Sequence, residues 1–190
     1  MERARYGEYL LTTEWEAPWS RAGVAARPVL EVGLGSYAAS MGWNIEVVGV
    51  RVSELANAVP DVFASTGTTM GFEDATSSAR APHLCAAKVG DWVVVIDVGC
   101  RLSGNVEYLV EASASTDLHL VRIADEPIAL HYQGGRQVTG ARGRVACLEI
   151  APRDDRDGEL CAMDVLAMRT GVAFHEDLWK AKFTLFELDL

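Results

Sequence analysis

The stretch VGDWVVVIDVGCRLSG, Val89–Gly104, places a run of β-branched residues directly after a turn-like Gly-Asp pair. Such a run is typical of a strand that follows a tight turn. Successive side chains of a strand point to opposite faces, so Val93, Val95 and Asp97 are predicted to share one face. The fold prediction therefore begins with a strand that carries one acid near its end.

Two interpretations of Asp97 follow from this position. If Val93 and Val95 face the core, Asp97 lies in an apolar site that disfavours its charged form, as in many catalytic acids. If it lies at the end of the sheet, it caps the turn at Gly99, and this interpretation is favoured. Glu46 lies similarly in the segment NIEVVG, and a Glu46–Asp97 pair across neighbouring strands would be an acid-base arrangement.

Further β-rich runs surround this strand. Turn signals at 89–91 and at Gly134-Gly135 predict two hairpins. An antiparallel sheet of about four to six strands is expected. Its predicted strands are WNIEVVGV at 43–50, HLCAAKVG at 83–90, DWVVVIDVG at 91–99, LHLVRIA at 118–124, IALHYQGGRQV at 128–138, GRVACLEIAP at 143–152 and KFTLFEL at 182–188.

Short helices are predicted between the strands. The longest covers 159–170 and ends at Gly171, the usual glycine after a helix. The others are a helix capped by Ser53 and ended at Pro60, one within 105–115, and one at 175–180.

The predicted fold class is α+β, with a mostly antiparallel twisted sheet and a few short helices packed on one face. A single domain over 1–190 is expected, with an N-terminal strand-helix unit at 1–64 and a sheet-rich part at 83–190. Between them, 65–82 is rich in Ser, Thr and Gly without a sustained period, which predicts a mobile loop.

Charge limits the classes of partner. The 190 residues carry a net charge of −10, which repels phosphate backbones, so no nucleic acid is expected. Arg136, Arg142 and Arg144 form the best basic group, but a solvated hairpin tip is the favoured interpretation. A protein partner with a basic surface suits the charge better, and a homo-oligomer is left open. No leader or membrane span is recognised, so a cytoplasmic protein is expected.

No motif predicts a cofactor or a metal. The segment GLGSYAAS at 33–40 lacks the third glycine and the lysine of a phosphate-binding loop. His83 and Cys85 lack a second pair at ligand spacing, and the four cysteines include no C-x-x-C pair. His119 and His131 lie on strands that could be neighbours, although such histidines are more often surface or core residues.

Four blocks of the chain resemble the uncharacterised bacterial domain-of-unknown-function family 6461. They are WNIEVVGVRVSELANAVP, GDWVVVIDVGCRLSG, DLHLVRIADEPIALHYQGGRQV and AMDVLAMRTGVAFHEDLWKAKFTLFEL. The chain departs from the family pattern at Asp97 and Cys100, where members often have glutamate and tryptophan, and in the 65–82 segment. The resemblance implies an α/β fold and a bacterial, cytoplasmic source, and it transfers no mechanism because the family has no assigned activity.

Two classes of function remain. The first is a non-enzymatic protein-interaction module, immunity-like or regulatory, with Trp15, Trp19 and Trp179 as anchors on a surface rimmed by acids. The second is a small enzyme or ligand-binding protein, in which acids and histidines of the sheet would converge on one pocket. Its catalytic candidates are Asp97, Glu46, His119 and His131. The first class is favoured, because the second needs a convergence for which the sequence gives no sign.

Overall fold

The computed structural model describes residues 44–124, 127–142 and 158–189. All of them belong to the unit Leu34–Leu190. Trp15, Trp19 and the predicted strand at 143–152 lie outside the described residues. A single domain over 1–190 therefore stays a prediction.

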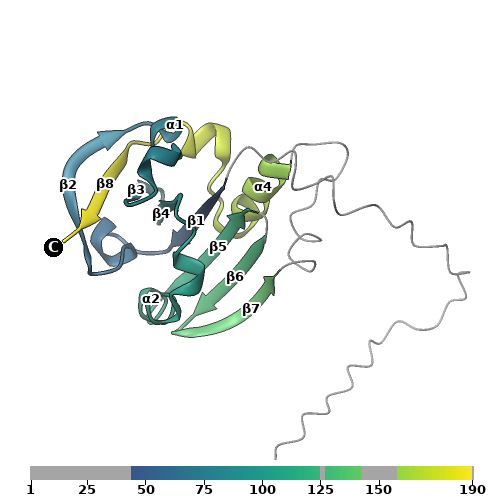
Figure 1. The fold of residues 1–190 in the computed structure, drawn as a ribbon. Coiled ribbons are helices and arrows are strands. Elements are labelled where there is room, and N and C mark those ends of the chain that lie inside the picture. The colour runs from purple at the N-terminus through teal and green to yellow at the C-terminus, as the bar shows by residue number, and fades with distance from the viewer. Residues whose placement is uncertain (1–43, 125–126, 143–157, 190) are drawn as a thin grey trace, which may run out of the picture. The chain divides into compact units, whose positions relative to one another are not determined.

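The described strands form one eight-stranded sheet in the order β2-β8-β3-β4-β1-β5-β6-β7 (Figure 1). Every neighbouring pair is antiparallel, which confirms the predicted kind of sheet. The strands are β1 (Ile45–Val50), β2 (Phe63–Met70), β3 (Leu84–Val89), β4 (Trp92–Asp97), β5 (Asp117–Ile123), β6 (Ile128–Gln133), β7 (Arg136–Arg142) and β8 (Phe183–Leu188).

Short helices connect these strands. The α-helices are α1 (Phe72–Ala75), α2 (Val106–Ala112) and α4 (Gly158–Thr170); the 3-10 helices are η2 (Leu55–Ala58), η3 (Ser78–Arg80) and η4 (Leu102–Gly104); and η5 (Phe174–Leu178) is a π-helix. Gly171 has φ 76° directly after α4, as expected for a glycine that ends a helix. None of the described helices is long and apolar enough to cross a membrane.

Strand β1 lies in the middle of the sheet, between β4 and β5. All six of its residues are buried. The predicted arrangement, with a separate N-terminal strand-helix unit packed against the sheet, is therefore wrong for this strand. The sequence around β1 gave no sign of this central position, because β1 pairs with β4 and β5, which are far away in the sequence.

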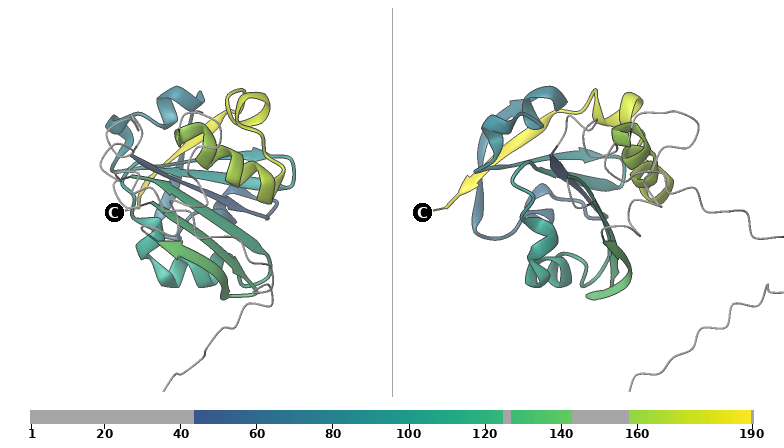
Figure 2. Two further views of the ribbon diagram at one scale, coloured as in Figure 1. Left: turned by 90° about the vertical axis from the view of Figure 1, so that its right-hand side faces the viewer. Right: turned by 45° about the vertical axis from the view of Figure 1, so that its right-hand side comes forward.

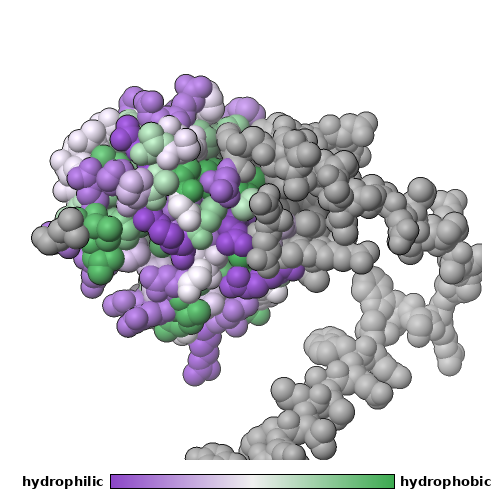
Figure 3. All heavy atoms as spheres, viewed as in Figure 1, coloured by the Kyte–Doolittle hydropathy of each residue, from purple (hydrophilic) through white to green (hydrophobic). Residues whose placement is uncertain are grey.

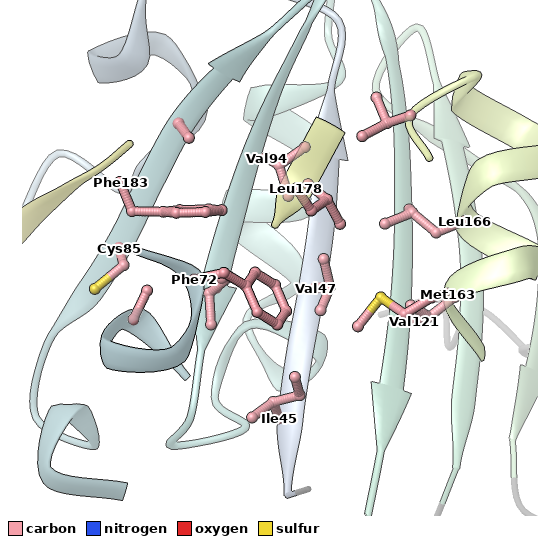
Figure 4. Packing of buried hydrophobic residues seen from close by; sticks show 14 of the residues in the cluster. Ile45, Val47, Phe72, Cys85, Val94, Val121, Met163, Leu166, Leu178 and Phe183 are labelled. Carbon is pink, nitrogen blue, oxygen red and sulfur yellow. The ribbon is translucent and has the colours of Figure 1, made fainter. Parts of the chain in front are cut away.

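Helices cover both faces of the sheet, and not one face as predicted. Alternate strand residues form two cores, which we call the α4-side core and the α2-side core. The first includes Val47, Val94 and Val121 with Met163 and Leu166 of α4 (Figure 4), and the second includes Val48, Val95 and Leu120 with Tyr108 and Leu109 of α2. Figure 2 shows α4 and α2 on opposite sides of the sheet. Strands whose side chains are apolar on both sides need cover on both faces.

The segment predicted as a mobile loop, 65–82, is instead folded structure. It continues β2, which pairs with β8, and then forms α1 and η3. Met70, Phe72 and Ala75 are buried in the α4-side core. The prediction failed because β2 is an edge strand of small polar residues, whose order comes from pairing with β8 and not from an apolar pattern.

Candidate functional site

Glu46 and Asp97 lie directly opposite each other on β1 and β4. Both side chains are fully buried. Val93 and Val95 belong to the α2-side core, so strand alternation places Asp97 on that face, as predicted. The structure thus contains the cross-strand pair of carboxylates that the sequence left as a possibility, and each member has its own set of bonds.

Asp97 organises the turn that follows β4. Its Oδ1 accepts the backbone N–H of Gly99 at 2.9 Å, and its Oδ2 accepts those of Arg101 at 2.7 Å and Leu102 at 3.2 Å. Cys100 takes φ 51° within this turn. A Cβ on Gly99 would lie 2.9 Å from the carbonyl oxygen of Ala81, so this position requires glycine. The geometry supports the capping interpretation of Asp97.

Arg101 completes the bonding of Asp97. Its Nη2 lies 2.9 Å from Oδ1 of Asp97 and also donates to the carbonyl oxygen of His83, while Nη1 donates to that of Pro82. The guanidinium lies over the ring of Phe63 at 5.5 Å. An ion pair between the buried Asp97 and the partly exposed Arg101 therefore joins the end of β4 to the segment that precedes β3.

Glu46 has a different environment. Its Oε2 accepts the backbone N–H of Ser103 at 2.9 Å, and its Oε1 lies 3.7 Å from Nη1 of Arg122 without a hydrogen-bond partner among the described residues. The pKa of Glu46 is raised above its ordinary value, mainly because the side chain is buried. Hydrogen bonds from Ser103 oppose this shift, the charge of Asp97 adds to it, and the charge of Arg122 opposes it. Arg142 also donates to the carbonyl oxygen of Ser103 at 3.2 Å. Among the described residues, Glu46 thus accepts fewer hydrogen bonds than Asp97.

Cys100, next to these carboxylates, is not an activated nucleophile. The pKa of its thiol is raised to about 11, mainly by burial and also by the charges of Glu46 and Asp97, which Arg122 opposes. A thiol with this pKa stays protonated at neutral pH, whereas a nucleophilic cysteine needs its thiolate form.

His119 and His131 lie opposite each other on β5 and β6, as their predicted strands allow. Their rings stack with centroids 4.2 Å apart, and the ring of Trp92 lies 5.6 Å from His119. Nε2 of His131 is 3.4 Å from Oδ1 of Asp117. His119 is 8% exposed, and its Nδ1 has no hydrogen-bond partner among the described residues. The pair is a half-buried stack, not a chelating arrangement.

This stack predicts acid sensitivity. The pKa of His119 is lowered to about 4, mainly by burial and also by the charges of His131 and Arg169, which Asp117 opposes. A folded-state pKa below the unfolded value of about 6.5 means that the unfolded chain takes up the proton first. Stability is therefore expected to fall by up to roughly 3 kcal/mol as the pH decreases from about 6.5 to about 4.

The check is urea denaturation of wild type and His119→Phe between pH 4 and 7. The stability difference between the two proteins should change with pH, with the variant gaining relative to wild type in acid. Exposed His175→Phe is the matched control and should run parallel to wild type. A His119→Phe curve parallel to wild type would contradict the prediction.

The four catalytic candidates do not meet. Glu46 and Asp97 lie on the face of the α2-side core, whereas His119 alternates with Leu118 and Leu120 of that core and so points to the opposite face. Within the described parts of the chain, no group of three or more His, Cys, Asp or Glu residues could hold a metal ion. The structure brings the candidates together as two pairs that the sheet separates.

An open depression of about 540 Å³ lies at the ends of β5 and β6. Arg51, Thr116, Asp117 and Gln133 are among its lining residues, so it reaches the acid that pairs with His131. It does not reach Glu46 or Asp97. A small polar ligand bound in this depression would contact Asp117, the acid that pairs with His131.

Trp179 lies on the surface, directly after η5. Trp179 is 47% exposed. The centroid of its ring lies 5.9 Å from that of Phe72 and 5.8 Å from that of Phe174. Phe72 also contacts Phe183 of the α4-side core at 6.0 Å. An exposed indole thus packs on the buried ring of Phe72 and the partly buried ring of Phe174. We call these three residues the Trp179 platform (Phe72, Phe174 and Trp179).

Sequence reasoning missed Arg101, Ser103 and Arg122, which hold the two carboxylates. A signal was present for Arg101, because it lies four residues after Asp97 in a turn with two glycines nearby. No local signal links Ser103 or Arg122 to Glu46, since they are 57 and 76 positions away and meet it only through the fold.

No family model, no curated protein and no solved structure matches the chain. The resemblance to family 6461 therefore stays a prediction.

Proposed function

We propose that this protein is a non-enzymatic protein-interaction module, immunity-like or regulatory, that contacts its partner through the Trp179 platform. The observation that carries the proposal is the half-exposed indole of Trp179 on its base of Phe72 and Phe174. The residues that contribute most of the binding energy at interfaces are enriched in tryptophan and lie in well-packed surroundings. A bacterial, cytoplasmic setting and membership of family 6461 belong to the same proposal.

The charge near the platform suits a basic partner. Glu73 and Asp74 follow Phe72 directly in α1, and Glu176 lies in η5; all three are exposed. Lys180 adds one positive charge beside them, and the whole chain has a net charge of −10. Acids around an aromatic anchor steer a basic surface toward it and favour that partner over an acidic one.

The alternative is a small enzyme or ligand-binding protein. The depression beside Asp117 and His131 favours a small polar ligand. Against catalysis, the oxygens of Asp97 already accept three backbone N–H groups and the guanidinium of Arg101, and the histidines lie on the other face. On the face drawn in Figure 3, hydrophilic residues separate the hydrophobic ones, so the described residues form no broad apolar patch on this face. A single anchor residue therefore suits a binding surface better than a broad apolar contact.

The test is affinity capture from a lysate of the source organism with wild type, Trp179→Ala and Met168→Ala, followed by binding measurements with the recovered partner. Met168 is the matched control, because it is 73% exposed and apolar but lies on α4 and outside the platform. Trp179→Ala is expected to weaken binding by about 30-fold or more, the typical cost of truncating an anchor, and Met168→Ala by less than about 3-fold.

Two results would contradict the proposal. One is a partner that binds wild type and Trp179→Ala equally well. The other is a small molecule that co-purifies with the protein and is lost on Asp117→Asn, which would favour the ligand-binding alternative. Circular dichroism of each variant confirms that a lost interaction does not reflect unfolding.

A further inference from the structure

We propose that the outer edge of β7 binds an extended acidic segment of a partner protein, which adds to the sheet as a further strand. This site is separate from the Trp179 platform and does not depend on it. Three features of the described residues carry the proposal: an edge without a neighbouring strand, a local surplus of positive charge, and a charge pattern that opposes self-pairing.

The edge itself is the first feature. β7 is the last strand in the described order and pairs with β6 alone. All of its residues except Ala141 are exposed. Four consecutive residues, Thr139 to Arg142, keep a regular register with β6, and the irregularity lies nearer the turn, between Thr139 and Gln137. A regular edge strand presents alternate backbone N–H and C=O groups to an added strand.

Local charge is the second feature. The hairpin of β6 and β7, residues 127–142, contains no Asp or Glu, although the chain has 27 of them. Arg136 and Arg142 are exposed at the two ends of β7. Arg142 also donates to the carbonyl oxygen of Ser103, which restrains its side chain at the strand end. In a chain of net charge −10, this edge is a site where an acidic strand meets complementary charge.

The third feature argues against a second copy of this chain as the occupant. An antiparallel β7–β7 pair would bring the end of β7 that carries Arg136 in one copy close to the end that carries Arg142 in the other, at both ends of the pair. Like charges directly opposite each other on paired strands are destabilising. A strand with acids near both ends would form two favourable pairs at the same positions.

The other edge of the sheet is less suited to the same role. β2 carries no charged side chain. The backbone N–H groups of Gly67 and Thr68 already bind the hydroxyls of Ser65 and Thr66, and the pairing of β2 with β8 is irregular between Ser65 and Thr69. Both features make β2 a poor template for an added strand.

The experiment uses the full chain and three fluorescent nine-residue peptides of the same Val/Thr alternation. One carries glutamate near both ends, one carries lysine at those positions, and one is the glutamate peptide with alternate backbone nitrogens methylated. Fluorescence anisotropy at low and high salt measures affinity, and hydrogen exchange locates the protected amides. We expect the glutamate peptide alone to bind, to weaken at least 5-fold with added salt, and to protect amides of β7.

Arg136→Glu should weaken binding of the glutamate peptide by about tenfold. Lys180→Glu is the matched charge reversal away from β7 and should change it by less than about twofold. Equal binding of the methylated peptide, equal binding of the lysine peptide, or protection of β2 in place of β7 would each overturn the proposal. So would self-association of the free protein with protection at β7, which would identify a second copy as the occupant.

Discussion

Replacing Asp97 with alanine is expected to lower the free energy of unfolding by about 3–5 kcal/mol, mainly because three backbone N–H groups lose their acceptor. The change leaves the guanidinium of Arg101 without its buried partner and frees the N–H groups of Gly99 and Leu102 from their acceptor. The partly exposed guanidinium can regain water, but a buried N–H group that loses its acceptor costs about 1–3 kcal/mol, and Asp97 accepts three backbone N–H groups. Since a domain is stable by only about 5–15 kcal/mol, much of the total would be lost.

Chemical denaturation at pH 7 measures this effect. Asp91→Asn is the matched control, because the Asp91 side chain is 80% exposed and only approaches Arg51, at 3.8 Å. Its expected cost is below about 1 kcal/mol. Asp97→Asn keeps the size of the side chain but offers one acceptor oxygen in place of two, so it should recover part of the loss. A stable Asp97→Ala protein would refute the role of Asp97 as the cap of the turn and reopen the catalytic interpretation.

Much of the fold could be predicted from local patterns. The hairpins at 89–91 and at Gly134-Gly135, the strand WVVVID and the helix that ends before Gly171 all appear where the sequence indicated them. These elements have strong local signals: β-branched runs, glycines with positive φ and helical periodicity. Their bounds follow from the sequence within a few residues.

What could not be predicted depends on pairing between distant segments. β1 reaches the centre of the sheet, and β2 is ordered by β8, more than 110 positions away in the sequence. The Ser- and Thr-rich sequence of β2 gives no sign of that pairing. A strand with few apolar residues cannot be recognised from its own sequence when its order depends on a distant partner. For this reason β2 was interpreted as part of a loop.

The candidate site shows the same division. Strand alternation correctly placed Asp97 with Val93 and Val95, and the sequence left a pair of Glu46 and Asp97 across neighbouring strands as a possibility. The two acids could converge with His119 and His131 only if all four side chains lay on the same face of the sheet. Alternation within one strand fixes relative sides, but only the register between strands shows that these two pairs lie on opposite faces.

Replacing Phe72 with alanine is the second change with a large expected effect, a loss of about 3–5 kcal/mol in the free energy of unfolding. Phe72 is 2% exposed, and its ring contacts Phe174, Trp179 and Phe183 at 5.2, 5.9 and 6.0 Å. Truncation would remove the centre of this aromatic group and leave a cavity between Trp179, Phe174 and Phe183. Because α1 has only four residues, its position depends on this side chain and not on helix stability of its own.

Urea denaturation of Phe72→Ala, Phe72→Leu and Val62→Ala separates packing from general sensitivity. Val62 is 58% exposed in the turn directly before β2, so its truncation should cost less than about 0.5 kcal/mol. Leucine fills part of the cavity, so Phe72→Leu is expected to lose about 1–2 kcal/mol and to remain folded. If the platform binds the partner, Phe72→Leu should also weaken that binding, because Trp179 loses the ring that supports it. A loss below about 1 kcal/mol for Phe72→Ala would mean that α1 is not anchored through Phe72.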